Sequence, residues 1–123
     1  MKTLPPKKKG LARIIAAFFY SIDGLKQALT KETAFKQEFI IYLLAIIPLY
    51  FIPINVFFKS LLLLAQTIIL IVELLNSAIE AVVDLNTLEY NILAKKAKDF
   101  GSAAVLISII LALTLWILAL LSL

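Results

Sequence analysis

The stretch from Leu61 to Asp84, LLLLAQTIILIVELLNSAIEAVVD, decides the fold, because a long apolar run ends in regularly spaced polar residues. An α-helix turns by about 100° per residue, so these polar residues share one narrow stripe. They are Glu73, Asn76, Ser77, Glu80 and Asp84. Ionisable groups are costly inside a membrane and mark functional sites there. The stretch therefore predicts a membrane-crossing helix that carries a functional site.

The composition of the 123-residue chain is typical of a membrane protein, with 63% hydrophobic and 16% charged residues. The chain has no Cys and no His, which excludes disulfides, thiolate zinc sites and imidazole catalysis. Any general base or metal ligand must then be a carboxylate. Eleven of the twelve basic residues lie in segments 2–36 and 95–98, beside apolar runs. This pattern follows the positive-inside rule rather than a nucleic-acid interface, so we expect no nucleic-acid partner.

Apolar runs and basic clusters predict an all-α membrane protein with a single domain over residues 1–123. After a basic tail at 1–9, residues 10–29 show an apolar and a polar face at helical period, which is typical of an amphipathic helix on the membrane surface. Three transmembrane helices are predicted, at 32–52, 56–84 and 98–122. The basic clusters place the N-terminus in the cytoplasm and the C-terminus outside.

Local signals refine the ends of these helices. Thr30 is expected to cap the first transmembrane helix, and Pro48 is expected to kink it. The polar segment 85–98 is predicted to be a cytoplasmic loop.

Carboxylates and cations near the cytoplasmic ends of the helices suggest phosphate chemistry. Paired Glu side chains suit Mg²⁺ with phosphate oxygens completing its coordination shell, and Arg13 and Lys98 suit phosphate itself. A carboxylate removed from water, as expected for Glu73, suits general-base catalysis. The chain has neither a Walker A motif nor a protein-kinase glycine loop. These residues leave two readings open: a catalytic membrane site, or a helical assembly in which Glu73 and Asn76 bind neighbouring helices.

Three segments closely resemble the small prokaryotic diacylglycerol kinase family: ELLNSAIEAVVD at 73–84, AKDFGSAAVLI at 97–107 and KETAFKQE at 31–38. Arg13-Ile14-Ile15 and Tyr20-Ser21 also match its surface helix, and the resemblance covers roughly residues 11–118. It implies a homotrimeric enzyme of the bacterial inner membrane that transfers the γ-phosphate of Mg²⁺-bound ATP to the primary hydroxyl of a membrane lipid. Sites in the family are shared between protomers, and we expect that one protomer does not shield Glu73 alone.

The resemblance also assigns a role to individual residues. Glu73 matches the general base and Asn76 the amide that supports it, whereas Glu32 and Glu80 match the metal ligands. The positions that match ATP-binding residues are Arg13, Tyr20, Glu32, Glu80, Glu89, Tyr90, Lys98 and Asp99. The positions that match lipid-binding residues are Arg13, Ser21, Phe35, Gln37, Glu38, Glu73 and Ser102. The chain departs from the family at Lys36 and Lys96, where Arg is common, and at Asn91, where His is frequent.

Simpler readings of some positions remain open. Tyr20 and Phe35 can be interfacial aromatic residues, Glu89 a solvated loop charge, and Ser102 a helix-packing residue.

The sequence therefore predicts a kinase that converts diacylglycerol to phosphatidic acid. An undecaprenol kinase of the same fold is the first alternative, although Glu38 and Gly101-Ser102 resemble the diacylglycerol branch more. A small cation channel or transport subunit with a ring of Glu73 side chains is the second, but such a pore has no need for Lys98-Asp99 or a surface helix.

Overall fold

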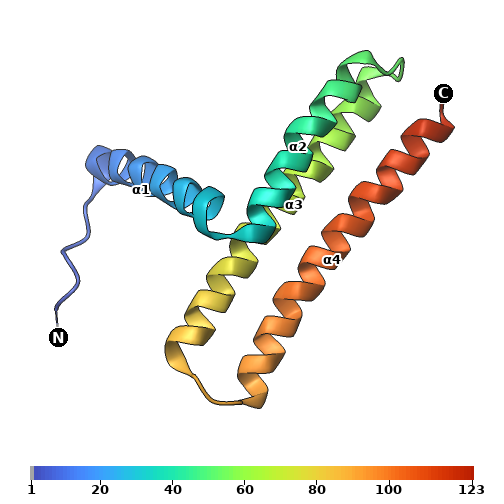
Figure 1. The fold of residues 1–123 in the computed structure, drawn as a ribbon. Helices are drawn as coiled ribbons and strands as arrows, with labels where there is room; N and C mark the ends of the chain where they lie inside the picture. The colour runs from blue at the N-terminus through green and yellow to red at the C-terminus, as the bar shows by residue number, and fades with distance from the viewer. Residues whose placement is uncertain (1) are drawn as a thin grey trace.

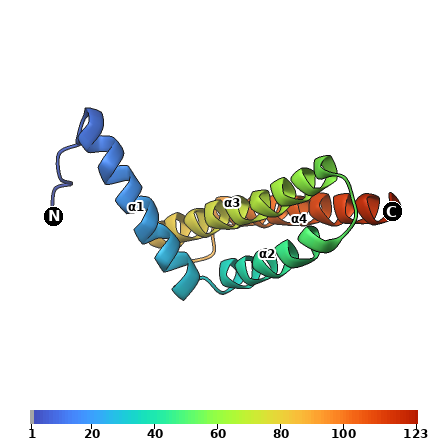
Figure 2. The ribbon, with the colours of Figure 1, turned by 90° about the horizontal axis from the view of Figure 1, so that it is seen from above.

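The computed structural model describes residues 2–123, and four helices account for most of them. They are α1 (Gly10–Lys31), α2 (Thr33–Phe51), α3 (Val56–Asn86) and α4 (Ile92–Leu121). Helices α2, α3 and α4 lie alongside one another, whereas α1 leads away from them at the start of α2 (Figures 1 and 2). All three of the bundled helices are long and apolar enough to cross a membrane. The predicted all-α class with three potential spans is confirmed.

Helices α3 and α4 form the most extensive contact in the structure. Leu62 of α3 is fully buried and packs with Leu49 of α2 and Ala119 of α4. A second cluster joins Ala65 and Ile69 to Ala112 of α4, and Ile109 and Leu115 pack against it. Small side chains let helix backbones approach closely inside a membrane, where dispersion forces rather than the hydrophobic effect hold helices together. Close packing along α3–α4 therefore positions the polar residues farther along the same pair.

Two asparagines fix the starts of the long helices. The side chain of Asn55 accepts a hydrogen bond from the backbone N–H of Phe58 at 2.9 Å. Asn91 accepts from the backbone N–H groups of Leu93 and Ala94 at 2.9 and 3.2 Å, so α4 begins at Ile92. The predicted loop over 85–98 was therefore wrong: α3 continues to Asn86, and only residues 87–91 connect the two helices.

The corner between α1 and α2 lies at Glu32, which has extended backbone angles. Glu32 is the C-cap of α1 and the N-cap of α2. The prediction that Thr30 caps the first transmembrane helix, α2, was wrong. Thr30 lies inside α1, and its hydroxyl donates to the carbonyl oxygen of Lys26 at 2.8 Å. The corner places the Glu32 carboxylate at the point where α1 meets the bundle. Pro48 lies inside α2, close to its end at Phe51.

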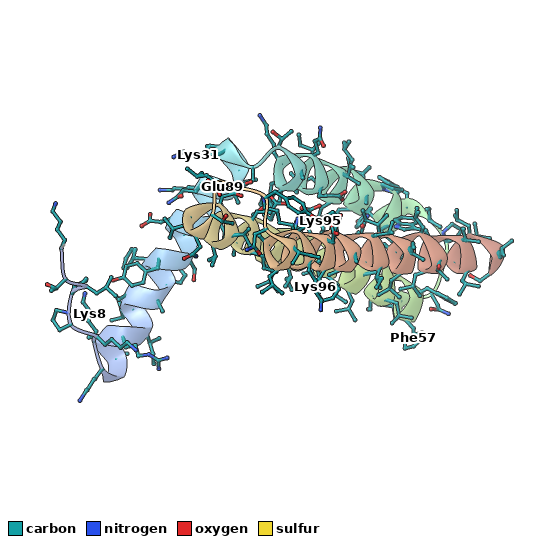
Figure 3. The ribbon with its side chains drawn as sticks, turned by 90° about the horizontal axis from the view of Figure 1, so that it is seen from below. Lys8, Lys31, Phe57, Glu89, Lys95 and Lys96 are labelled. Atoms are coloured by element: carbon teal, nitrogen blue, oxygen red, sulfur yellow. The ribbon has the colours of Figure 1, made fainter. Side chains whose placement is uncertain are left out.

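Charged side chains are concentrated toward one end of the bundle. Figure 3 shows Glu89, Lys95 and Lys96 toward the end formed by the α3–α4 loop, and Phe57 near the opposite end. The α1–α2 corner with Lys31 lies partway along α3 (Figure 1). The polar residues of α3 lie in the half of the helix that leads to this charged end.

Candidate active site

Glu73 is a buried carboxylate in the middle of the chain's longest helix. Only 6% of its surface is exposed, and the flanking residues of α3 are almost all apolar. The carboxylates of Glu38 on α2 and Glu80 on α3 lie close enough to act on it electrostatically. One chain therefore buries Glu73 without a partner, which corrects the expectation that a single protomer does not shield it.

The side chain of Asn76 joins the two long helices next to Glu73. Its Nδ2 donates a hydrogen bond to Oε1 of Glu80 at 3.2 Å, and its Oδ1 is buried without a partner in the described part of the chain. The amide packs against Gly101 of α4, where an added Cβ would overlap Oδ1 and approach Cγ to 3.2 Å. Gly101 is thus the place on α4 that admits this amide, and Asn76 holds the carboxylate of Glu80 in turn.

Two ion pairs lie where α3 and α4 meet the connecting loop. Lys98 Nζ contacts Asp84 Oδ1 at 2.6 Å across the two helices, and Lys95 Nζ contacts Asp99 Oδ2 at 2.5 Å one turn along α4. The predicted nucleotide pair, Lys98 and Asp99, is therefore held by different partners. All four side chains are 43–62% exposed, so a phosphate can compete for these cations at low cost.

A hollow of about 540 Å³ opens beside these ion pairs. It brings together four of the residues predicted to bind ATP, from the loop and from α4: Glu89, Tyr90, Lys98 and Asp99. Asp84 and Lys95 complete its charged lining. The hollow thus combines exposed cations, carboxylates and an aromatic ring, a set that suits a nucleotide with its phosphates.

Glu32 lies in a second hollow, of about 590 Å³, between α1 and α3. Ser21, Ser77 and Ala78 line it as well, and the hydroxyl of Ser21 donates to the carbonyl oxygen of Ala17 at 2.9 Å. Gln37 shares a smaller hollow of about 340 Å³ with Glu32 on its other side. The carboxylate is therefore placed at the corner with open space on both sides.

The two predicted metal ligands fit a hard cation by their chemistry. Glu32 and Glu80 are exposed carboxylates, and neither forms an ion pair within residues 2–123. Residues 2–123 contain no cluster of three or more acidic side chains that could bind a metal ion without other ligands. A cation here would therefore need phosphate oxygens and water to complete its shell, as Mg²⁺ commonly does.

An apolar groove of about 490 Å³ runs along the bundle between α2 and α4, with α3 as its floor. Glu38 lines it, as do Gln66 of α3 and Trp116 of α4. Phe35, another predicted lipid-binding residue, is buried and stacks on Phe39 at a ring distance of 6.3 Å. The groove offers an elongated apolar ligand a path along the part of the bundle able to lie in a membrane.

The remaining predicted residues line another hollow or lie on the exposed surface. Arg13 and Tyr20 line a hollow of about 370 Å³ with the N-terminal segment, which includes Lys7 and Lys8. Ser102 follows Gly101 on α4 and is exposed. The structure therefore gathers the predicted residues into several hollows around the charged end instead of one pocket.

Comparison with known proteins identifies the family to which this arrangement belongs. The family model described as prokaryotic diacylglycerol kinase matches residues 19–120. The chain belongs to the prokaryotic diacylglycerol kinase family. Diacylglycerol kinase of Escherichia coli is 47% identical over 107 residues, which cover 87% of this chain and 88% of that protein.

Two more distant relatives within the prokaryotic diacylglycerol kinase family show the same extent of similarity. Diacylglycerol kinase of Helicobacter pylori is 43% identical over 113 residues, covering 92% of this chain and 88% of that protein. The Pseudomonas aeruginosa protein of the same name is 38% identical over 107 residues, covering 87% of each. The family resemblance inferred from residues 31–38, 73–84 and 97–107 is confirmed.

Sequence reasoning missed several contacts that shape the site in this family member. Asp84 had no assigned role, and the structure pairs it with Lys98. Lys95 was read only as part of a basic cluster, and the structure pairs it with Asp99. The spacing of four between Lys95 and Asp99 is a helical signal, but it was hidden by the predicted loop over 85–98.

Proposed function

We propose that the chain transfers the γ-phosphate of ATP to the primary hydroxyl of diacylglycerol, forming phosphatidic acid at the cytoplasmic face of the bacterial inner membrane. The observation that carries the proposal is the course of α3, which leads from buried Glu73 to exposed Glu80 within seven residues. This separation is about 10.5 Å along the helix axis, which joins an apolar environment to an aqueous one. A lipid hydroxyl and a nucleotide phosphate can meet over that distance.

Glu73 acts as the general base in this proposal. Its carboxylate accepts the proton of the lipid hydroxyl while the hydroxyl oxygen attacks the γ-phosphorus, and the bond to the β-phosphate oxygen breaks to release ADP. The burial of Glu73 supports this role, because a base in a site that excludes water favours transfer to the lipid hydroxyl over hydrolysis of ATP. Asn76 keeps Glu80 in place on the next turn of the same helix.

Glu80 and Glu32 hold the Mg²⁺ that accompanies ATP. When bound, the cation neutralises phosphate charge and orients the γ-phosphoryl group. Glu80 contributes an exposed carboxylate that Asn76 orients, and Glu32 contributes a carboxylate fixed at the α1–α2 corner. Glu32 lines the hollow between α1 and α3, and Glu80 is not among the residues that line it, which supports a homotrimer in which neighbouring protomers complete each site.

ATP is proposed to occupy the hollow at the α3–α4 loop. Lys98 exchanges its contact with Asp84 for a phosphate oxygen, and Glu89 and Tyr90 face the rest of the nucleotide. Arg13 and Tyr20 line a different hollow of the same chain, so they are proposed to reach the phosphates of a neighbouring protomer. In this arrangement α1 lies on the membrane surface, and its exposed Leu11, Ile14 and Phe18 contact lipid.

The lipid substrate is proposed to enter along the groove between α2 and α4. Glu38 lines the groove, and Phe35, Gln37, Ser21 and Ser102 are proposed to contact the polar part of the lipid. The apolar lining of the groove supports an acyl-chain ligand.

A test offers purified protein diacylglycerol and undecaprenol in parallel with Mg²⁺ and radiolabelled ATP. Labelled phosphatidic acid, formed faster than labelled undecaprenyl phosphate, is the expected result. Preferred labelling of undecaprenol would assign the chain to the alternative substrate, and no labelling of either lipid would rule out a lipid kinase. Cation flux through protein-containing vesicles without phosphate transfer would instead favour a channel.

A further inference from the structure

Gln66 is an amide buried deep in the apolar half of α3. Only 9% of its surface is exposed, and the neighbouring positions of the helix contribute Ala65 and Ile69 to the apolar core. Gln66 precedes Glu73 by seven residues, so it lies about 10.5 Å farther from the charged end and on the same face of the helix. A buried polar side chain at this depth needs a partner or a function.

The structure supplies no partner for this amide among the described residues. No group of residues 2–123 forms a hydrogen bond with the side-chain amide of Gln66, whereas the side chain of the adjacent Thr67 donates to the carbonyl oxygen of Leu63 at 2.8 Å and contacts the hydroxyl of Tyr42 at 3.4 Å. The amide atoms of Gln66 are open to the groove, since Asn76 Oδ1 is the only fully enclosed side-chain N or O atom without a partner in the described part of the chain. An amide in an apolar groove is unfavourable unless a ligand replaces its hydrogen bonds to water. The difference between the two neighbours points to a partner for Gln66 from outside the chain.

The groove identifies where that partner comes from. Gln66 lines the groove of about 490 Å³ together with Glu38, which lies on the side of Glu73, and with Ala45, Ala112 and Trp116. Apart from Glu38 and Gln66 its lining is apolar or aromatic. A ligand that pairs with Gln66 must therefore carry a hydrogen-bonding group within an otherwise apolar body, and a carbonyl oxygen can accept from the amide N–H.

We propose that Gln66 is a specificity-determining residue whose amide N–H donates a hydrogen bond to an ester carbonyl of the lipid substrate. The inference rests on the proposed function, which places the lipid hydroxyl at Glu73. Two hydrogen bonds of about 2.8 Å each, one at Glu73 and one at Gln66, leave about 5 Å of the 10.5 Å separation. A glycerol ester spans such a distance between its free hydroxyl and a carbonyl oxygen, whereas a polyprenol carries no acceptor there. Gln66 therefore selects glycerol esters against polyprenols.

The test compares an ester-linked diacylglycerol with an ether-linked dialkylglycerol of the same chain length. The ether lipid keeps the hydroxyl and the shape of the substrate but has no carbonyl oxygen. The unchanged protein is expected to prefer the ester by about tenfold in kcat/KM, which is the effect of one hydrogen bond in an apolar site. In Gln66→Met, which keeps the length of the side chain without a donor, the ratio is expected to fall to about one, with the KM for Mg²⁺-ATP unchanged.

Thr67→Val is the matched control, because Thr67 is the neighbouring polar residue but already has partners within the chain. It is expected to keep the ester preference. Gln66→Leu serves as a second variant, and both replacements are apolar, so folding is not expected to suffer.

An ester preference that survives in Gln66→Met would overturn the inference. So would an equal loss of activity toward both lipids, because that result assigns Gln66 to packing between helices or protomers. Absence of phosphate transfer by the unchanged protein to any lipid would overturn the proposed function itself.

Discussion

The two halves of the α3–α4 pair are held together in different ways. In the half near the α2–α3 turn, Leu62, Ala65 and Ile69 of α3 pack against Ala112 and Ala119 of α4 without a polar group in either cluster. In the half near the α3–α4 loop, the contacts are Asn76 against Gly101 and the ion pair of Asp84 with Lys98. One pair of helices therefore combines an apolar half built for packing with a polar half built for chemistry.

The energies of these contacts support that division. The exposed Asp84–Lys98 pair adds little stability because water and salt screen it, and the unpaired Oδ1 of Asn76 costs about 1–3 kcal/mol. The polar half thus adds little net stability. A chain that retains such a region must gain something else from it, and the proposed phosphate transfer is that gain. Changes in the two halves should then affect different properties.

The largest effect is expected in the polar half, from Glu73→Gln. Without the carboxylate no group accepts the proton of the lipid hydroxyl, and turnover is expected to fall by about 10²–10⁴-fold. Affinity for Mg²⁺-ATP should remain, because Glu80 and Lys98 are unchanged. The measurement is phosphate transfer to diacylglycerol, with nucleotide binding determined by equilibrium dialysis. Near-normal transfer would show that Glu73 is not the base.

The apolar half is tested by Leu62→Ala. Leu62 is fully buried between α2 and α4, so the substitution leaves a cavity and is expected to lower the unfolding free energy by about 2–5 kcal/mol. Unfolding in mixed micelles with increasing denaturing detergent measures the change. The KM for Mg²⁺-ATP should stay the same below the unfolding transition. A changed KM with normal stability would contradict the division.

A smaller effect on stability is expected from a substitution at Gly101, where α4 packs closely against Asn76 in the polar half. A methyl group in Gly101→Ala overlaps the amide of Asn76, and we expect a loss of about 1–3 kcal/mol in unfolding free energy together with weaker Mg²⁺-ATP binding. Gly24→Ala is the control, since an added Cβ there meets nothing within 4 Å. The double variant Asn76→Ala/Gly101→Ala should recover the stability. If it does not, Gly101 has another role.

The smallest effect is expected from Lys95→Ala. Its ion pair with Asp99 spans one turn of α4, and both side chains are more than half exposed. Such pairs contribute about 0.3–0.5 kcal/mol, so the unfolding free energy should hardly change. A loss above about 1 kcal/mol would show that the polar half stabilises the fold more than its contacts indicate.

The sequence predicted the helical class and the three apolar helices because both depend on local composition and period. The start of α4 was harder to predict, because the segment Ile92–Lys98 contains three lysines and its polarity suggested a loop. Asn91 caps a helix there instead, and Ala and Lys favour helical structure even when exposed. The misplacement of Thr30 has a similar cause, because its hydroxyl found a partner within α1.

The spacing of polar residues along α3 predicted which residues belong to the candidate site, but it did not predict the contacts that these residues make. The i, i+4 spacing of Asn76 and Glu80 is local and readable, whereas the contacts of Asn76 with Gly101 and of Asp84 with Lys98 join two helices. Such contacts depend on the register of α4 against α3, which small residues set by packing and which hydropathy does not reveal.

The most direct test of the division between the two halves is the unfolding free energy of the Glu73→Gln protein, measured on the preparation whose turnover is lost. Removing a buried ionisable group should leave this free energy within about 1 kcal/mol of the unchanged protein, or raise it, because the desolvation penalty of the carboxylate disappears. A loss of several kcal/mol, comparable with that of Leu62→Ala, would contradict the account, because Glu73 would then support the fold and the lost turnover would follow from unfolding.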